Sequence, residues 1–186
     1  MKNKVWIIIA VAFVAIMILA AVLYPKLSEK YSTDEKQNNA SYENVVQADD
    51  FTVYDSEMNA VKLSEYFGKP IVINFWASWC GPCKSELPAF DAMYEKYGDE
   101  VVFMMINLTD GYNETVNGVK EFVFDGGYSF PVYYDTKYDA ANTYGIYSIP
   151  ETVFINTDGS IYHTQLGAMS EKVLENYIKQ MIGEEK

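Results

Sequence analysis

The stretch of sequence that decides the fold runs from Ile71 to Leu87 and reads IVINFWASWCGPCKSEL. Its first six residues are mostly apolar, which is typical of a short strand buried on both faces of a sheet. A helix is predicted from Cys80 and Cys83 onward, kinked by Pro88 and ending at Gly98. A buried strand, a Cys-x-x-Cys pair and a helix in immediate succession indicate a site of thiol chemistry.

The position of Cys80 at the predicted start of this helix favours a reactive thiol. Unpaired backbone N–H groups and the positive end of the helix dipole both stabilise a thiolate there. Cys83 lies one turn inside the helix on the same side, so it can attack a mixed disulfide formed at Cys80 and release the reduced substrate. Cys80 is therefore the predicted nucleophile and Cys83 the predicted resolving cysteine.

The two cysteines are the only ones in the chain, and this limits the roles other than thiol chemistry that the pair can have. With the single His163 they supply three conventional soft ligands, one fewer than a structural zinc usually takes. A zinc half-site shared between two chains, or a pair of unreactive buried cysteines, stays as an alternative. Covalent haem attachment requires a histidine directly after the second cysteine, where this chain has Lys84. The sequence predicts no metal and no cofactor.

The segment Asn74–Lys84 closely resembles the active-site segment of the thioredoxins, and the resemblance extends from about Phe51 to Met181. It implies an α/β thioredoxin fold, in which helices flank a central mixed sheet. Ile149-Pro150 falls where that family keeps a cis-proline. A cis bond there would leave the backbone groups of Ile149 able to pair with an extended substrate. Ile149 and Pro150 are therefore expected to bind substrate.

More narrowly, the pattern Cys-x-x-Cys-x-x-Glu-Leu-Pro at residues 80–88 is similar to that of the TlpA/ResA family of membrane-anchored, extracytoplasmic thiol-disulfide oxidoreductases. A leading hairpin, an amino-terminal anchor and an extra helix and strand between Leu108 and Asp135 also fit that family. The resemblance implies reduction of disulfides in partner proteins outside the cytoplasmic membrane, notably in apocytochrome c before haem attachment. It also implies re-reduction by a membrane thiol transporter of the CcdA kind.

Other residues near the cysteines are expected to tune their chemistry. Gly81-Pro82 matches the strongly reducing thioredoxins rather than the strong oxidants, which favours a reductant. Thioredoxins place an acid in the buried strand, whereas this chain has Asn74, which forms hydrogen bonds but does not titrate. Glu86, three residues after Cys83, is therefore the expected proton-handling group, with its pKa raised by partial burial. The alternative for Glu86 is a solvated helix acid.

Several aromatic and titratable side chains elsewhere in the domain have either a functional or a packing role. Trp79, next to the nucleophile, is expected to form an apolar platform for the partner protein. Glu151, directly after the proline, would disfavour the Cys80 thiolate or select cationic partners, and the alternative is a side chain that faces water. His163 is expected to be a packed or surface side chain rather than a base. Tyrosines such as Tyr144 are expected to pack in the core rather than to line a ligand site.

The amino terminus predicts a membrane anchor. Residues 5–24 are twenty positions without a charged side chain, about the length that a helix needs to cross the bilayer core. The run exceeds the apolar core of a typical signal peptide, so an uncleaved anchor is favoured over a cleaved signal. Residues 1–4 are then a cytoplasmic tip, residues 25–47 a polar linker, and residues 48–186 an extracytoplasmic thioredoxin-like domain.

The predicted domain at residues 48–186 contains 22 acidic residues and 9 lysines, and the whole chain has a net charge of −12. A broad nucleic-acid interface needs a basic face, so this charge argues against a nucleic-acid partner. The expected function is thiol-disulfide exchange in the reducing direction. A disulfide oxidase or isomerase shares the same motif, and an anchored module that holds a partner without turnover is the alternative from another class.

Strands that alternate with helices indicate a sheet with parallel pairs. The hydrophobic content of 49% and the aromatic content of 16% are enough for a sizeable core. The remaining predicted elements are a hairpin of residues 51–54 and 60–63, a helical turn capped by Ser64, a strand at 101–106, a helix at 114–124, a strand at 130–134, and a hairpin of residues 152–156 and 160–166. A last helix is capped by Ser170, and its apolar face consists of Val173, Leu174, Tyr177, Ile178 and Met181.

Overall fold

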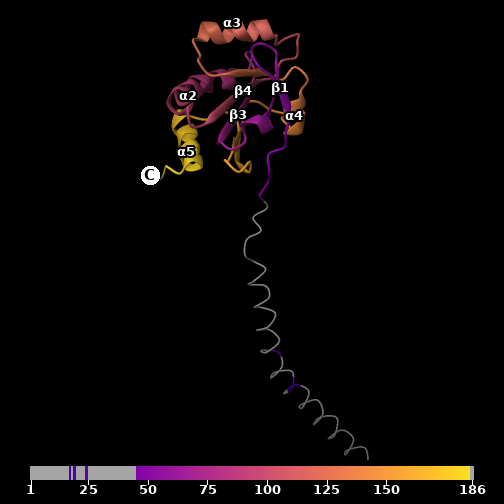
Figure 1. The fold of residues 1–186 in the computed structure, drawn as a ribbon, viewed down its shortest axis with the longest axis vertical. Helices are drawn as coiled ribbons and strands as arrows, with labels where there is room; N and C mark the ends of the chain where they lie inside the picture. The colour runs from indigo at the N-terminus through magenta and orange to yellow at the C-terminus, as the bar shows by residue number, and fades with distance from the viewer. Residues whose placement is uncertain (1–16, 18, 20–23, 25–44, 185–186) are drawn as a thin grey trace, which may run out of the picture. The chain divides into compact units, whose positions relative to one another are not determined.

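The computed structural model describes residues 17, 19, 24 and 45–184. The predicted tip at 1–4, most of the predicted anchor and most of the predicted linker lie outside these residues. Within the described part of the chain, no helix has both the length and the apolar character to cross a bilayer. The folded unit begins at Val45, and Gln47 pairs with Ser160, so it includes the last residues that the sequence assigns to the linker (Figure 1).

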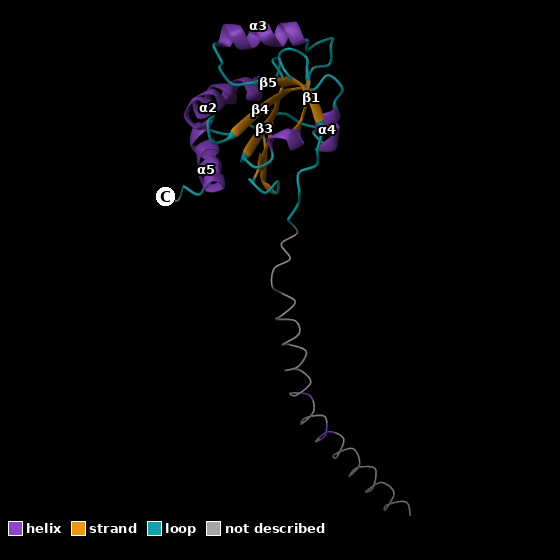
Figure 2. Cartoon of the chain, viewed as in Figure 1, coloured by secondary structure: helices purple, strands orange, loops and turns teal. Residues whose placement is uncertain are grey.

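A seven-stranded mixed sheet forms the centre of this unit (Figure 2). Its strand order is β2-β1-β5-β4-β3-β6-β7, with β3, β4 and β5 parallel and the other neighbouring pairs antiparallel. The strands are β1 (Thr52–Tyr54), β2 (Ala60–Lys62), β3 (Ile71–Trp76), β4 (Val102–Asn107), β5 (Val132–Tyr134), β6 (Glu151–Ile155) and β7 (Ile161–Leu166). This sheet and its flanking helices form the thioredoxin-like α/β fold that the resemblance implies.

Helices cover both faces of the sheet. Figure 1 shows α2 and α5 on one side of the strands and α4 on the other. Successive side chains of a strand point to opposite faces, so Val72 and Trp76 of β3 pack with α2 and α5, whereas Ile73 and Phe75 pack with α4 and η1. The helices are η1 (Leu63–Tyr66, a 3-10 helix), α2 (Gly81–Tyr97), α3 (Val116–Gly126), α4 (Asp139–Thr143) and α5 (Glu171–Ile182).

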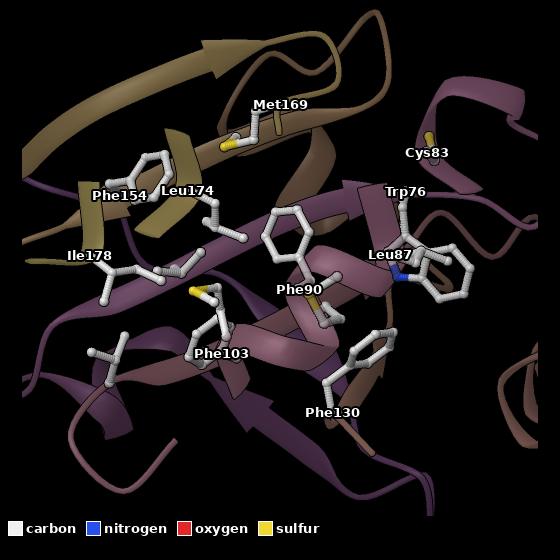
Figure 3. Close-up of a cluster of buried hydrophobic side chains, with 14 of the residues drawn as sticks. Trp76, Cys83, Leu87, Phe90, Phe103, Phe130, Phe154, Met169, Leu174 and Ile178 are labelled. Atoms are coloured by element: carbon white, nitrogen blue, oxygen red, sulfur yellow. The ribbon is translucent and has the colours of Figure 1, made fainter. Parts of the chain in front are cut away.

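The larger core anchors the helix that carries the cysteines. Leu87 and Phe90 of α2 are fully buried among side chains from β4 and α5 (Figure 3). Full burial of side chains of this size contributes roughly 1.5–3 kcal/mol each. Cys83 belongs to the same cluster and lies beside Trp76 at its margin. The active-site helix is therefore held in place by the core along its inner face.

The predicted strands and long helices are confirmed, and β3 begins and ends at the predicted residues. Helix α2 continues through Pro88 and ends at Tyr97, with Gly98 as the expected C-cap. The helical turn after β2 differs, because Ser64 lies inside η1 and does not cap it. Its backbone N–H and hydroxyl instead donate hydrogen bonds to the carboxylate of Asp50, both at 2.9 Å.

The beginnings of the later helices also depart from prediction. Helix α3 begins two residues late, because the side chain of Thr115 caps it by accepting the N–H of Gly118 at 3.1 Å. Ser170 stands at the N-cap of α5 without a side-chain capping bond, and Val173 is 38% exposed rather than buried. Helix α4 was not predicted, because five residues are too few for a helical period to be visible in sequence.

Candidate active site

A disulfide between Cys80 and Cys83 lies where β3 gives way to α2. Cys80 is the N-cap of α2, and its Sγ accepts the backbone N–H of Cys83 at 3.1 Å. The same Sγ lies 3.7 Å from the carbonyl oxygen of Ile149. Cys80 retains 5% exposure and Cys83 none. A partner protein approaching from solvent therefore meets Cys80 first.

The first turn of α2 suits a thiolate at Cys80. In the reduced pair, the Cys80 sulfur can keep the N–H bond from Cys83 and faces the positive end of the helix dipole, and both effects lower a thiol pKa. Gly81 and Pro82 are exposed, and Pro82 removes only an N–H that the first helical turn leaves unpaired anyway. The geometry is compatible with the roles expected for both cysteines.

The loop before β6 brings Ile149 and Pro150 to the disulfide from a position 69 residues further along the chain. The Ile149–Pro150 peptide bond is cis, in agreement with the expectation from the resemblance. Ile149 is half-buried and Pro150 is buried. The carbonyl of Pro150 accepts the N–H of Gly167 at 2.8 Å, which fastens this loop to the end of β7.

Glu86 lies one turn beyond Cys83 and is almost completely buried, with 1% exposure. Its Oε1 accepts a hydrogen bond from Asn74 Nδ2 at 2.9 Å, and its Oε2 accepts the N–H of Met169 at 3.0 Å. Desolvation outweighs these two bonds and raises the pKa of Glu86 to about 7. The expected burial and raised pKa of Glu86 are confirmed, and a solvated helix acid is excluded.

Asn74 connects this carboxyl group to the sheet. Besides donating to Glu86, its Nδ2 donates to Thr152 Oγ1 at 3.0 Å, in the neighbouring strand β6. Asn74 is fully buried, so the amide fixes the orientation of Glu86 without adding a charge. The described residues show no direct hydrogen bond between Glu86 and either cysteine.

Trp79 is the exposed aromatic side chain beside the disulfide. Its side chain is 60% exposed, and it lines a hollow of about 450 Å³ together with Asp110 and Asn113. Trp76, three residues earlier, is instead fully buried, and its ring packs against Phe122 with centroids 5.8 Å apart. The position of Trp79 suits the expected platform for a partner.

Glu114 is a buried residue near the site that sequence reasoning missed. It is 1% exposed, and its Oε1 accepts the backbone N–H of Ser78 at 2.7 Å and the Nδ2 of Asn107 at 2.6 Å. Its Oε2 accepts the hydroxyl of Ser78 at 2.7 Å. Glu114 therefore holds the loop that leads into Cys80. No sequence pattern distinguished it from a surface acid, since its contact with Ser78 spans 36 residues.

The other candidate residues from the sequence lie at the start of β6 or pack against aromatic rings. Glu151 is half-buried at the start of β6, and desolvation raises its pKa. The ring of His163 stacks on Tyr177 with centroids 4.4 Å apart, and Tyr144 packs against Phe51 at 5.6 Å, so both are packing residues as expected. Within the residues that the structure describes, no group of three or more His, Cys, Asp or Glu side chains is arranged to hold a metal ion.

The amino-acid sequence was compared with protein families and with curated proteins, and both comparisons find thiol-disulfide oxidoreductase relatives or the redoxin family. The Redoxin family matches residues 44–180, a range that contains both cysteines and Pro150. A curated relative, the thiol-disulfide oxidoreductase ResA of Bacillus thuringiensis subsp. konkukian, is 30% identical over 168 residues, which cover 90% of this chain and 93% of the relative.

Solved structures give the same result. The structure of StoA from Bacillus subtilis has a TM-score of 0.62 at 29% identity and covers 72% of this chain and 98% of StoA. The pneumococcal exposed lipoprotein thioredoxin Etrx1 from Streptococcus pneumoniae has a TM-score of 0.58 at 27% identity and covers 70% of this chain and 99% of Etrx1.

Proposed function

Since the chain belongs to the redoxin family and is a TlpA/ResA-like thiol-disulfide oxidoreductase of the thioredoxin superfamily, we propose that it works as a reductant of protein disulfides outside the cytoplasmic membrane. One observation carries the proposal. Cys80 caps α2, accepts the N–H of Cys83 and lies 3.7 Å from the Ile149 carbonyl, so the sulfur that a partner reaches is the one whose thiolate the helix stabilises.

The reaction proceeds by two exchanges. The Cys80 thiolate attacks one sulfur of the partner's disulfide, so that a bond forms between Cys80 and that sulfur while the other partner sulfur leaves as a thiolate and takes a proton. The Cys83 thiolate then attacks Cys80 Sγ, closes the Cys80–Cys83 disulfide and releases the second partner sulfur, which is also protonated. Two electrons pass from the cysteine pair to the partner.

Glu86 handles the proton of Cys83 in this scheme. Cys83 is fully buried and has to lose its proton before it can attack. A carboxyl group with a pKa of about 7, one turn away, can accept a proton at neutral pH and return it later. In the part of the chain that the structure describes, Glu86 bonds only to Asn74 and Met169, so its carboxyl group acts on Cys83 from one helical turn away rather than through a direct hydrogen bond. Asn74 acts as a positioning residue, since it holds Glu86 Oε1.

The partner binds at the surface around Cys80. Trp79 provides exposed apolar area, and Ile149, which precedes the buried Pro150, provides the backbone groups against which an extended segment can pair. Because recognition by backbone pairing tolerates different sequences, the site suits disulfides in more than one protein. Apocytochrome c, with its cysteine pair oxidised before haem attachment, is the substrate that the family resemblance favours.

The proposed location combines an anchor at residues 5–24 with a catalytic domain on the extracytoplasmic side. Disulfide substrates persist in oxidising compartments, which supports this side of the membrane. Etrx1, a structural relative, is described as an exposed lipoprotein. A reductant outside the membrane needs electrons from inside, so we propose a membrane thiol transporter of the CcdA kind as the donor.

Trapping of the mixed disulfide tests the function. Cys83→Ser removes the resolving thiol, so the variant should accumulate a covalent adduct with oxidised apocytochrome c that dithiothreitol releases. Cys80→Ser is the matched control and should form no such adduct, because the remaining thiol is buried. If neither variant forms an adduct and the wild-type protein does not accelerate reduction of apocytochrome c by dithiothreitol, the proposed function is wrong.

A further inference from the structure

The hollow beside Trp79 is lined by one aromatic, one acidic and one amide side chain. The two exchange steps at the cysteines do not require the acidic side chain. The three lining side chains are those of Trp79, Asp110 and Asn113, and the hollow has a volume of about 450 Å³. The face of an indole ring attracts cations, and a carboxylate does so more strongly. Among the residues that the structure describes, no lysine lines the hollow. Its surface therefore combines an exposed aromatic ring with a negative charge, and the ring belongs to the residue that directly precedes the nucleophile Cys80.

The carboxylate of Asp110 is fixed in its place and charged at neutral pH. Its Oδ1 accepts the backbone N–H groups of Tyr112 at 2.7 Å and of Glu114 at 2.8 Å, and its Oδ2 accepts Asn113 Nδ2 at 3.1 Å. These bonds, with that from Glu114 first, hold the pKa of Asp110 below its usual range. A carboxylate oxygen can accept two hydrogen bonds, so Oδ2 can still accept one from a ligand.

Glu114 ties the two walls of the hollow to each other. Its backbone N–H donates to Asp110, while its buried carboxylate accepts both the N–H and the hydroxyl of Ser78, the residue before Trp79. The loop that carries the carboxylate and the loop that carries the indole thus form one hydrogen-bonded unit around a side chain with 1% exposure. The hollow is built before any partner arrives.

We propose that this hollow binds the side chain of a lysine or arginine that stands close to the disulfide in the partner protein. The inference rests on the proposed function, and it names a chemical class of substrate for the same site. A guanidinium group can lie over the indole of Trp79 and donate to Asp110 Oδ2 at the same time. Since Trp79 is next to Cys80 in the chain, the cationic residue belongs within about three positions of the attacked cysteine.

The charge of the whole protein supports a cationic partner. The chain has a net charge of −12, so a positively charged segment approaches it faster than a neutral or acidic one. Steering of this kind acts on all cationic partners alike. The hollow adds a preference that depends on where the positive charge stands relative to the disulfide, and this difference makes the two effects separable by experiment.

The test compares two peptides that each contain one intramolecular disulfide and differ only beside the attacked cysteine, where one has arginine and the other glutamine. The full-length protein reduces them with dithiothreitol as the electron source, and kcat/KM is measured for each. We expect the arginine peptide to be preferred about three- to tenfold, as is usual for an exposed cation–aromatic contact combined with an ion pair.

Asp110→Asn should lower this ratio toward one, because the amide oxygen can still accept the two backbone N–H groups while the charge is lost. Asp99→Asn is the matched control, since it removes one exposed negative charge from the turn before β4 and should keep the ratio. Trp79→Leu is a second variant, which removes the indole face from a position that is 60% exposed, and it should also lower the ratio.

The possible results separate the two proposals. Equal kcat/KM for the two peptides with the wild-type protein would overturn the cation site and leave the reductase function standing. An equally large loss of the arginine preference in Asp99→Asn and in Asp110→Asn would also contradict the cation site, because the preference would then depend on the net charge of the protein alone. Reduction of neither peptide would contradict the proposed function, and the cation site with it.

Discussion

Glu86 is a residue at which burial and hydrogen bonding oppose each other. Its carboxyl group titrates near 4.5 in an unfolded chain and near 7 in the folded protein, because desolvation outweighs the bonds from Asn74 and Met169. The folded state therefore binds more protons than the unfolded state between these two pH values. The stability that this group contributes is fully present below pH 4.5 and is lost as the pH rises through 7, by an amount on the order of 3 kcal/mol.

Glu86→Gln should remove this dependence, because the amide does not titrate. The free energy of unfolding by urea, measured at pH 4.5 and at pH 8, should fall by about 3 kcal/mol more in the wild-type protein than in the variant. The variant should also turn over more slowly, since it cannot accept the proton of Cys83. An equal fall in stability in both proteins would contradict the buried carboxyl, and an unchanged rate would remove its role in proton handling.

Glu114 is predicted to matter for stability as well as for the hollow beside Trp79. Glu114→Ala leaves the N–H of Ser78 and the amide of Asn107 without their acceptor in a buried place, at a cost of about 2–3 kcal/mol. Chemical denaturation measures this loss. Glu121→Ala, an exposed acid on α3, is the control and should change stability by less than about 0.5 kcal/mol. A similar loss in both variants would contradict a stabilising role for the hydrogen bonds that Glu114 accepts from Ser78 and Asn107.

Residues whose role depends on local spacing could be predicted from sequence. Cys80, Cys83 and Glu86 follow one another at intervals of three on one helix, so their proximity is encoded in the spacing itself. Asp110 and Glu114 could not be found in this way, because the walls of the hollow come from two loops that only the folded sheet brings together. Acidic side chains in a polar loop look like solvated surface residues until their partners are known.

The C-terminal end of helix α3 depends on a left-handed backbone conformation at its C-cap, which a substitution can test. Gly127 follows its last residue with a φ of 69°, a left-handed conformation that side chains with a Cβ adopt at a cost. A Cβ at this position would meet nothing within 4 Å, so steric contact adds no further penalty. The backbone conformation alone should decide the effect of a substitution.

Gly127→Ala should therefore destabilise the protein by about 1 kcal/mol, and Gly127→Asn by less, since asparagine tolerates the left-handed region better than alanine. Thermal unfolding of the two variants beside the wild-type protein measures the order. A larger loss for asparagine than for alanine would contradict the left-handed end of α3.

Elements were predictable where the apolar pattern was strong and clearly bounded. The strand at 71–76 is predictable to the residue, because a mostly apolar run lies between Pro70 and the small residues Ala77 and Ser78. Helix α4 was missed because five residues carry no visible period. The start of α3 was placed too early because Glu114, which resembles an acid of a first helical turn, instead turns inward to Ser78.

At the scale of the whole molecule, the order of the strands creates the active site. Pairing of β3 with β6 places the loop before β6 against the loop after β3, and this pairing brings Ile149 to within 3.7 Å of Cys80 Sγ. The sequence predicts the strands and the two hairpins, but it does not predict that β3 and β6 are neighbours. The order of the strands in the sheet could be expected only from the resemblance to thioredoxins, whereas the chemistry of the cysteine pair could be argued from its own residues.

The equilibrium reduction potential of the Cys80–Cys83 pair tests the central claim, that this oxidoreductase is a reductant, most directly. The protein is equilibrated with dithiothreitol and glutathione buffers, and its free thiols are trapped and counted. A potential near the roughly −270 mV of thioredoxin is predicted, since Gly81-Pro82 separates the cysteines as in strongly reducing thioredoxins. A potential near the roughly −120 mV of strong oxidants would contradict the claim and make the protein a disulfide donor.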